Sequence, residues 1–306
     1  MTAAIEISGI TKRYGTVTAL DGVSFRVEPG ELFGLIGPDG AGKSSLYRIL
    51  ATLALPDSGS AKVCGLDVAG DYRELRTRIG YMPEKFSLYQ DLTVTENLHF
   101  FASLFGVSVR ENFPLIAPIF GQLEKFPSRK AGALSGGMKQ KLALSCALIH
   151  RPEILLLDEP TTGVDAVSRS EFWEMLSQLT RSGITVLVST SYMDEATRCG
   201  RIAMINEGHI LAVDSPAALA GSLGENLYNA VAPDMFRLLT QLRTMPDVID
   251  CYTFGATLHL VAAPGFSPGE TVAALTRRGL RDVRIYPAQG DIEDLFIKQI
   301  RDGKQR

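Results

Sequence analysis

Apolar and polar positions alternate near the start of the chain and then give way to short, wholly apolar runs. Within the first 30 residues the alternation stands between turn residues, which predicts two or three antiparallel strands at a sheet edge. Helical patterns separate the later apolar runs, which are residues 32–36, 154–157, 184–188 and 202–205. Such runs are typical of parallel strands buried on both faces and joined by crossover helices. This part of the chain therefore predicts an α/β domain.

Two helices follow from capping and periodicity. Ser135 is a good N-cap residue, and apolar residues then recur at helical spacing until Arg151-Pro152 stops the pattern. A second helix is predicted over residues 168–182. Its apolar stripe consists of Phe172, Trp173, Leu176 and Leu179. We interpret that stripe as core rather than as a ligand-binding surface.

The pattern loosens around residues 215–226 and then resumes on a smaller scale. Strand and helix patterns follow in the order βαββαβ, with a final helix after them. The predicted elements cover residues 227–231, 234–243, 248–254, 257–261, 270–277, 283–286 and 292–300. This order suggests a small α+β module of the ferredoxin-like kind. We therefore predict two domains, residues 1–222 and residues 223–306.

Composition narrows the classes of function. The 306 residues carry a formal net charge of -3 and are 45% hydrophobic, which permits a sizeable core but gives no electrostatic footprint for nucleic acid. No uninterrupted apolar stretch is long enough to span a bilayer, and the first residues lack the pattern of a secretion signal. The four cysteines are scattered, so we expect buried, reduced side chains in a cytosol-facing protein.

A glycine-rich loop is the strongest chemical signal. It follows a predicted strand, opens a predicted helix and reads Gly37, Pro38, Asp39, Gly40, Ala41, Gly42, Lys43 and Ser44, with Ser45 next. Glycines let the backbone wrap around a polyphosphate, and the helix presents its positive dipole end to that anion. In such a P-loop we expect Lys43 to reach the β- and γ-phosphates and the Ser44 hydroxyl to ligate Mg²⁺.

Two carboxylates end the apolar run at residues 154–157. Asp158 and Glu159 would be costly there without a metal ion or a water molecule to serve. We expect Asp158 to hold Mg²⁺ through water. Glu159 is then the candidate general base, which orients and deprotonates the water that attacks the phosphate.

A third motif identifies a family. Leu134, Ser135, Gly136, Gly137 and Met138 resemble the signature sequence of ABC ATPases, normally LSGGQ, and they precede the acidic strand as in that family. The resemblance covers residues 4–215 and implies ATP and Mg²⁺ as cofactors. It also implies the P-loop ABC cassette fold, with an antiparallel edge sheet, a parallel core sheet and a helical subdomain at residues 85–150. The signature helix would form a second anion site, offered across a dimer interface to the partner's γ-phosphate.

The same resemblance assigns further residues and partners. Tyr14 matches the aromatic residue that stacks on adenine, although an edge-strand core tyrosine is the alternative. Asp165 matches the loop that links the two active sites. Residues 92–98 match the start of the helical subdomain, whose groove receives a helix of a membrane subunit.

Residues 291–297 look like the ending of ATPases of drug, polysaccharide and lipid exporters. The implied partners are a second ATP-binding subunit, identical or different, and integral membrane permease subunits. The implied location is the cytoplasmic face of the inner or plasma membrane. For the C-terminal domain we expect a regulatory or dimerisation role, with a stabilising appendage as the alternative.

The chain departs from the family pattern at two positions. Glu84 stands where a glutamine usually touches Mg²⁺ and the water; a carboxylate can still ligate the metal ion but lacks the amide donors. Ser191 stands where a histidine contacts the γ-phosphate, and a hydroxyl is shorter and cannot carry positive charge.

Two interpretations of these departures stay open. The chain hydrolyses ATP slowly through Glu159, or it is the weaker half of an asymmetric pair and lends its signature to the partner's site. Two other classes of function are a soluble ABC ATPase outside transport and a nucleotide-switched regulator. The absence of coiled-coil or zinc insertions argues against the first, and Glu159 argues against the second.

Overall fold

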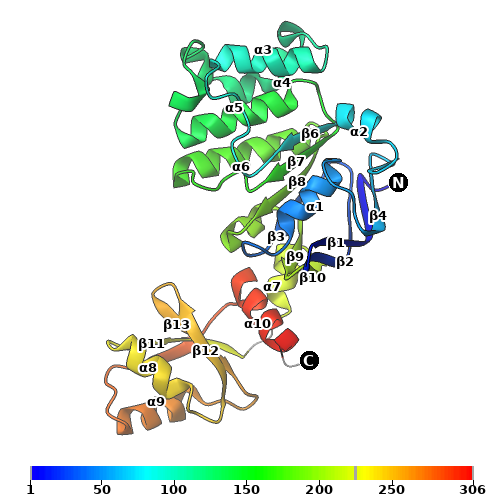
Figure 1. The fold of residues 1–306 in the computed structure, drawn as a ribbon. Helices are drawn as coiled ribbons and strands as arrows, with labels where there is room; N and C mark the ends of the chain where they lie inside the picture. Colours follow the sequence, from blue (N-terminus) through cyan, green and yellow to red (C-terminus); the bar gives the residue numbers. More distant parts are fainter. Residues whose placement is uncertain (1, 224–225, 305–306) are drawn as a thin grey trace. The chain divides into compact units, whose positions relative to one another are not determined.

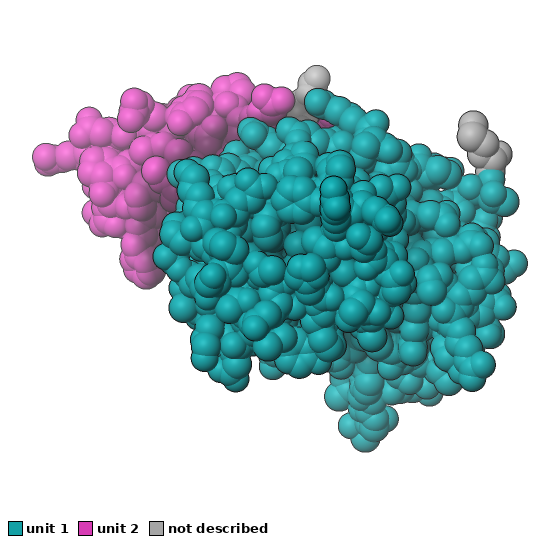
Figure 2. Space-filling model, turned by 90° about the horizontal axis from the view of Figure 1, so that it is seen from above, with its two compact units in different colours: residues 1–216 teal, residues 217–306 magenta. Residues whose placement is uncertain are grey.

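The computed structural model describes residues 2–223 and 226–304, and the chain divides into two compact units, Met1–Pro216 and Ala217–Arg306 (Figure 2). The sequence placed a domain boundary a few residues later, between residues 222 and 223. The intervening stretch forms a short helix, α7 (Pro216–Gly221), which the loose sequence pattern did not predict. Across the described residues, every helix falls short of the length or the hydropathy that crossing a bilayer would require.

The first unit begins with a small antiparallel sheet of order β2-β1-β4-β5. Its strands are β1 (Ile5–Tyr14), β2 (Val17–Val27), β4 (Ser58–Val63) and β5 (Leu66–Asp67). The antiparallel pair predicted in the first 30 residues is confirmed, because β1 and β2 pair from Ile5↔Val27 to Tyr14↔Val17.

A larger sheet of order β10-β9-β3-β8-β7-β6 forms the centre of this unit. Its strands are β3 (Leu32–Ile36), β6 (Ile79–Met82), β7 (Ile154–Asp158), β8 (Thr185–Thr190), β9 (Arg201–Asn206) and β10 (His209–Asp214). All neighbours are parallel except β9 and β10, so the predicted parallel strands are confirmed. Because parallel strands end at the same edge, the residues after β3, β6, β7 and β8 gather there.

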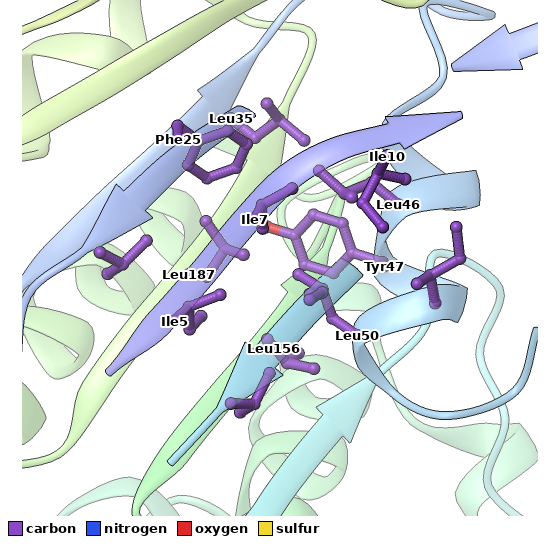
Figure 3. Close-up of a cluster of buried hydrophobic side chains, with 14 of the residues drawn as sticks. Ile5, Ile7, Ile10, Phe25, Leu35, Leu46, Tyr47, Leu50, Leu156 and Leu187 are labelled. Carbon is purple, nitrogen blue, oxygen red and sulfur yellow. The ribbon is translucent and has the colours of Figure 1, made fainter. Parts of the chain in front are cut away.

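Helix α1 (Lys43–Leu50) lies between the two sheets (Figure 1). Its Leu46, Tyr47 and Leu50 are fully buried against residues from both sheets, as Figure 3 shows. Each large apolar side chain buried in this way contributes about 1.5–3 kcal/mol. The helix that follows the glycine-rich loop is therefore firmly anchored in the core.

The remaining helices of this unit are α2 (Tyr72–Arg78), α3 (Val94–Leu104), α4 (Val109–Phe120), α5 (Gly136–Leu148) and α6 (Ala166–Arg181). Single-turn to two-turn 3-10 helices span Leu123–Lys125, Ala131–Ala133 and Met193–Arg198. Helices α3, α4 and α5 pack on one another. The helix predicted after Ser135 is confirmed as α5, and Ser135 caps it by accepting from Met138 N.

The second unit is a four-stranded antiparallel sheet of order β12-β13-β11-β14. Its elements are β11 (Leu227–Val231), α8 (Met235–Leu242), β12 (Val248–Phe254), β13 (Thr257–Ala262), α9 (Pro268–Arg277), β14 (Arg284–Pro287) and α10 (Ile292–Lys304). Element order and strand order together are those of a ferredoxin-like module, so this prediction is confirmed. A separate apolar core joins α8 and α9 to one face of the sheet.

A buried polar cluster attaches α10 to the sheet of the second unit. The carboxylate of Asp294 accepts a hydrogen bond from the Tyr252 hydroxyl at 2.7 Å and lies 2.5 Å from Nδ1 of His259. Asp294 and His259 are both buried. His259 therefore has a structural partner. The cysteines are free, and all but the half-buried Cys64 are buried, as expected.

We predict that Asp294→Ala lowers the free energy of unfolding by about 3–5 kcal/mol, because it removes one partner of a buried polar cluster. Chemical denaturation of the full chain measures the loss. The exposed Asp247 offers a control, and Asp247→Ala is expected to stay within about 0.5 kcal/mol of wild type. Equal effects of the two substitutions would contradict the anchoring role.

Candidate active site

A pocket of about 350 Å³ opens at the edge where the parallel strands end. It is lined by Ala19, Asp39, Gly40, Gly42, Lys43, Ser44, Ser45, Glu84 and Glu159. The structure thus brings together the P-loop, the candidate base and Glu84, which lie far apart in the sequence. Ala19 was not predicted from the sequence, and no local signal marks it.

The loop needs glycine where its backbone turns and where other backbone comes close. Gly40 and Gly42 have positive φ angles of 81° and 105°, a region that other residues adopt at a cost. A Cβ atom on Gly42 would lie 2.3 Å from the carbonyl oxygen of Ala19, and one on Gly37 would lie 2.1 Å from that of Ile205. Gly42 is also the N-cap of α1, so no side chain competes for the first N–H groups of the helix. The loop is built to present backbone donors to an anion.

Lys43 connects the loop to the acidic strand end. Its side chain is only 5% exposed, and Nζ donates hydrogen bonds to the carbonyl oxygens of Gly37 at 2.6 Å and Pro38 at 2.9 Å. The same Nζ lies 2.9 Å from Oε1 of Glu159. The cation of the loop and the carboxylate after β7 therefore form one buried group.

Asp158 and Glu159 are held by different partners. Asp158, 1% exposed, accepts a hydrogen bond from the Ser189 hydroxyl at 2.7 Å. Burial raises the pKa of Asp158, while hydrogen bonds from Ser189 and Ser44 oppose that rise. Oε2 of Glu159 accepts from the Thr162 hydroxyl at 3.1 Å and from the backbone N–H of Ser191 at 3.2 Å.

The backbone of Glu159 is strained. Its φ angle of 50° lies in the left-handed region, which costs a residue with a side chain about 1–3 kcal/mol. Such strain persists only where the surroundings hold it, and here the N–H of Glu159 donates to Ser189 Oγ at 2.9 Å. Strained residues of this kind cluster at functional sites.

The signature segment lies outside this pocket. Ser135 and Gly136 are exposed, whereas Gly137 is buried against α6. A Cβ atom on Gly137 would lie 2.6 Å from Ser168 Oγ, so only glycine permits this packing. The neighbouring Asp165 caps α6 by accepting from the N–H groups of Val167 at 3.1 Å and Ser168 at 3.0 Å. The tip of the signature helix and the Asp165 loop thus form one surface.

Comparison with known proteins shows the family to which this chain belongs. A family described as "ABC transporter" matches residues 20–162. The Nod factor export ATP-binding protein I of Paraburkholderia xenovorans (strain LB400) is 36% identical over 308 residues, which cover 97% of this chain and 96% of that protein. The chain belongs to the ABC transporter family. It is an ATP-binding cassette of that family.

Other relatives agree with this assignment. The probable multidrug ABC transporter ATP-binding protein YbhF of Escherichia coli (strain K12) is 39% identical over 301 residues, and the cassette spans 52% of that protein's length. A solved ATP-binding subunit of an ABC transporter has a TM-score of 0.66 and 28% identity, covering 73% of this chain and 94% of that one. The cassette MJ0796, in a dimeric post-hydrolysis state with ADP and Pi, has a TM-score of 0.63 and 26% identity, with coverages of 69% and 98%.

Three further predicted site residues of this ABC cassette lie at or near the pocket. Glu84 follows β6, is exposed and lines the pocket, and its charge contributes to the raised pKa of Asp158. Ser191, the second departure from the expected pattern, reaches Glu159 through its backbone N–H. Tyr14 ends β1 outside the pocket lining, and the residue is 44% exposed. That exposure contradicts the alternative of a core tyrosine, and Lys12 Nζ lies 5.5 Å from the centre of the ring.

We predict that Asp158→Asn stabilises the ligand-free chain at pH 7 in the presence of a chelator. The pKa of Asp158 is raised in the folded state, so its charge opposes folding above the ordinary carboxyl pKa of 3.8. The gain is expected to vanish when the pH falls below that value, because Asp158 is then protonated in both states. Thermal unfolding at a series of pH values measures it.

Asp165→Asn provides the opposite control. Hydrogen bonds from the backbone, that of Ser168 first, lower the pKa of Asp165, so its charge supports folding above the ordinary pKa. This variant should lose stability at pH 7, and the loss should disappear as the pH falls through the lowered folded-state pKa. Stabilities that change in the same direction for both variants would overturn this view of the site.

Proposed function

We propose that this ABC cassette hydrolyses ATP with Mg²⁺ and that the reaction powers export through separate membrane subunits. The observation that carries the proposal is the contact between Lys43 Nζ and Glu159 Oε1 at 2.9 Å, in the pocket beside the glycine-rich loop. It puts a phosphate-binding cation and a general base in one pocket. The export ATP-binding relatives supply the direction of transport.

The residues of the pocket fit a triphosphate and its metal ion. The Gly42 region leaves no room for a side chain, and the open N–H groups of α1 suit the phosphates. Hard oxygen donors for Mg²⁺ would come from the neighbouring side chains of Ser44 and Asp158. Bound Mg²⁺ would neutralise charge on the phosphates, and Glu84 is placed to contribute a further oxygen.

The ion pair suggests how the base is released. Lys43 is shared between loop carbonyls and Glu159. A γ-phosphate competes for that ammonium group, because a phosphate oxygen is a strong acceptor. Glu159, still held by Thr162 and by the Ser191 N–H, then accepts a hydrogen bond and finally a proton from the attacking water.

The exposed signature tip supports a dimeric site. Ser135, the N-cap of α5, and Gly136, its first residue, are exposed and do not line the pocket that contains Lys43. We propose that this tip closes over the γ-phosphate held by a second ATP-binding subunit, with Asp165 at the same interface, while Tyr14 stacks on adenine. Backbone N–H groups at a helix start are suited to that anion.

An apolar groove in the first unit is the surface that we propose to receive a helix of a membrane subunit. It has a volume of about 630 Å³, and its lining includes Leu53, Leu88, Phe101, Leu104 and Phe105. Leu53 and Leu104 are among its exposed residues. Asn97 fixes the adjoining segment, since its amide donates to the carbonyl oxygens of Tyr89, Leu92 and Thr93. Docking there would link the membrane subunit to Glu84 and place the cassette at the cytoplasmic face of the membrane.

The second unit is proposed to regulate or stabilise the dimer.

We predict that Glu159→Gln lowers kcat for ATP by about 10²–10⁴-fold, the usual contribution of a positioned base, while ATP still binds. Phosphate release and nucleotide titration measure the two effects. Glu153→Gln, at an exposed acid just before β7, should leave kcat within about twofold of wild type. Wild-type turnover in the Glu159 variant would refute the assignment of the base.

We predict that Ser191→His raises kcat of the chain assayed alone by about 10–10³-fold, because it adds a cationic donor near the γ-phosphate. Ser191→Gln, which lengthens the side chain without charge, should give a much smaller gain. Steady-state phosphate release compares the three proteins. Vigorous turnover by wild type, unchanged in Ser191→His, would contradict both the slow-site and the asymmetric-pair interpretations.

A further inference from the structure

Ser189 occupies a position in the large sheet that no sequence motif marks. It is the residue before the last of β8, and it is fully buried. In the parallel pairing of β7 and β8, Ser189 stands opposite Asp158, the last residue of β7. Its side chain therefore lies at the point where the sheet ends and the pocket begins.

One hydroxyl group engages both acidic residues. Ser189 Oγ donates to Asp158 Oδ1 at 2.7 Å and accepts from the backbone N–H of Glu159 at 2.9 Å. The hydroxyl thus uses its single donor and one acceptor site on two consecutive residues. The side chain of Asp158 and the main chain of Glu159 are tied to the same atom.

Ser189 contacts the main chain of Glu159, whereas the other partners of Glu159 contact its carboxylate. Lys43, Thr162 and the Ser191 N–H all reach the carboxylate. Only the Ser189 bond, among the hydrogen bonds of the described residues, holds the N–H of Glu159, whose backbone is left-handed. It therefore fixes the strained turn from which the carboxylate projects.

A second buried hydroxyl lies next to this pair. Tyr47, fully buried on α1, lies close to Ser189 and Asp158; burial and then the charge of Asp158 raise the pKa of its hydroxyl, which stays neutral. Without Ser189 Oγ, a buried N–H and a buried carboxylate oxygen would both lose a partner, and such loss is costly. The acidic pair would reorient rather than keep its geometry.

We propose that Ser189 is the positioning residue of this ATPase site, orienting Asp158 towards Mg²⁺ and Glu159 towards the attacking water through one hydroxyl group. The proposal rests on the proposed function of the pocket. It assigns to Ser189 no contact with ATP or with the reacting atoms. The alternative is a purely structural serine that satisfies two buried polar groups.

The test compares Ser189→Ala with Ser189→Thr, which keeps a hydroxyl, and with Ser145→Ala. Ser145 is a matched control, because it is also fully buried and its hydroxyl donates to a backbone carbonyl, that of Lys141. The full chain is titrated with a fluorescent ATP analogue in chelator and in increasing Mg²⁺, and kcat, KM and thermal unfolding are measured alongside.

We expect Ser189→Ala to need about three to ten times more Mg²⁺ for half-maximal tightening of ATP binding, with chelator-phase binding unchanged. We also expect kcat to fall about 10–100-fold at nearly constant KM, as for a base misplaced by about 1 Å. Ser189→Thr should recover most of both effects. In a Glu159→Gln background, Ser189→Ala should cause little further loss of kcat, because the two residues act as a unit.

Results that would contradict the role of Ser189 differ from those that would contradict the proposed function. An unchanged Mg²⁺ requirement in Ser189→Ala overturns the proposal, whatever the rate. So does a loss in Ser145→Ala of equal size, which would indicate general destabilisation. Failure of wild type to bind the analogue or to respond to Mg²⁺ would instead refute the proposed function itself.

Discussion

The structure depends on keeping two adjacent carboxylates buried at the end of an apolar strand. Asp158 and Glu159 end a strand whose neighbours on both sides are parallel and buried, so water offers them little solvation. Burial of charge is costly unless partners compensate. Ser189 from β8 and Lys43 from α1 provide much of that compensation. The pairing of β7 with β8 and the placement of α1 between two sheets bring these partners to one edge.

The same constraint explains why the pocket and the signature surface are separate. The phosphate loop must follow β3 to meet the acids of β7, whereas Ser135 begins a helix that packs on α6 through Gly137. In our proposal, a cassette built in this way presents one half of an ATP site in its pocket and the complementary half on another surface. The dimer of our proposal joins the two halves, and the apolar groove connects closure to a membrane subunit.

The sequence predicts what is local and misses what depends on packing between distant segments. Caps and apolar periodicity were enough for α5, and uninterrupted apolar runs were enough for the parallel strands. The glycine loop was recognised, but the reason that Gly42 must be glycine is the carbonyl of Ala19, more than twenty residues away. Likewise, nothing around Ser189 announces its bonds to Asp158 and Glu159. Helix α4 contains two prolines, a pattern that propensity alone disfavours.

The most direct test of the account is a calorimetric titration of ATP with Mg²⁺ into the full chain and into Lys43→Ala, with the exposed Lys62→Ala as control. Loss of a charge-assisted contact to the phosphates predicts affinity about 10–100-fold weaker in Lys43→Ala and unchanged in the control. An ATP affinity in Lys43→Ala equal to that of wild type, in a protein with an unaltered unfolding temperature, would contradict the central claim.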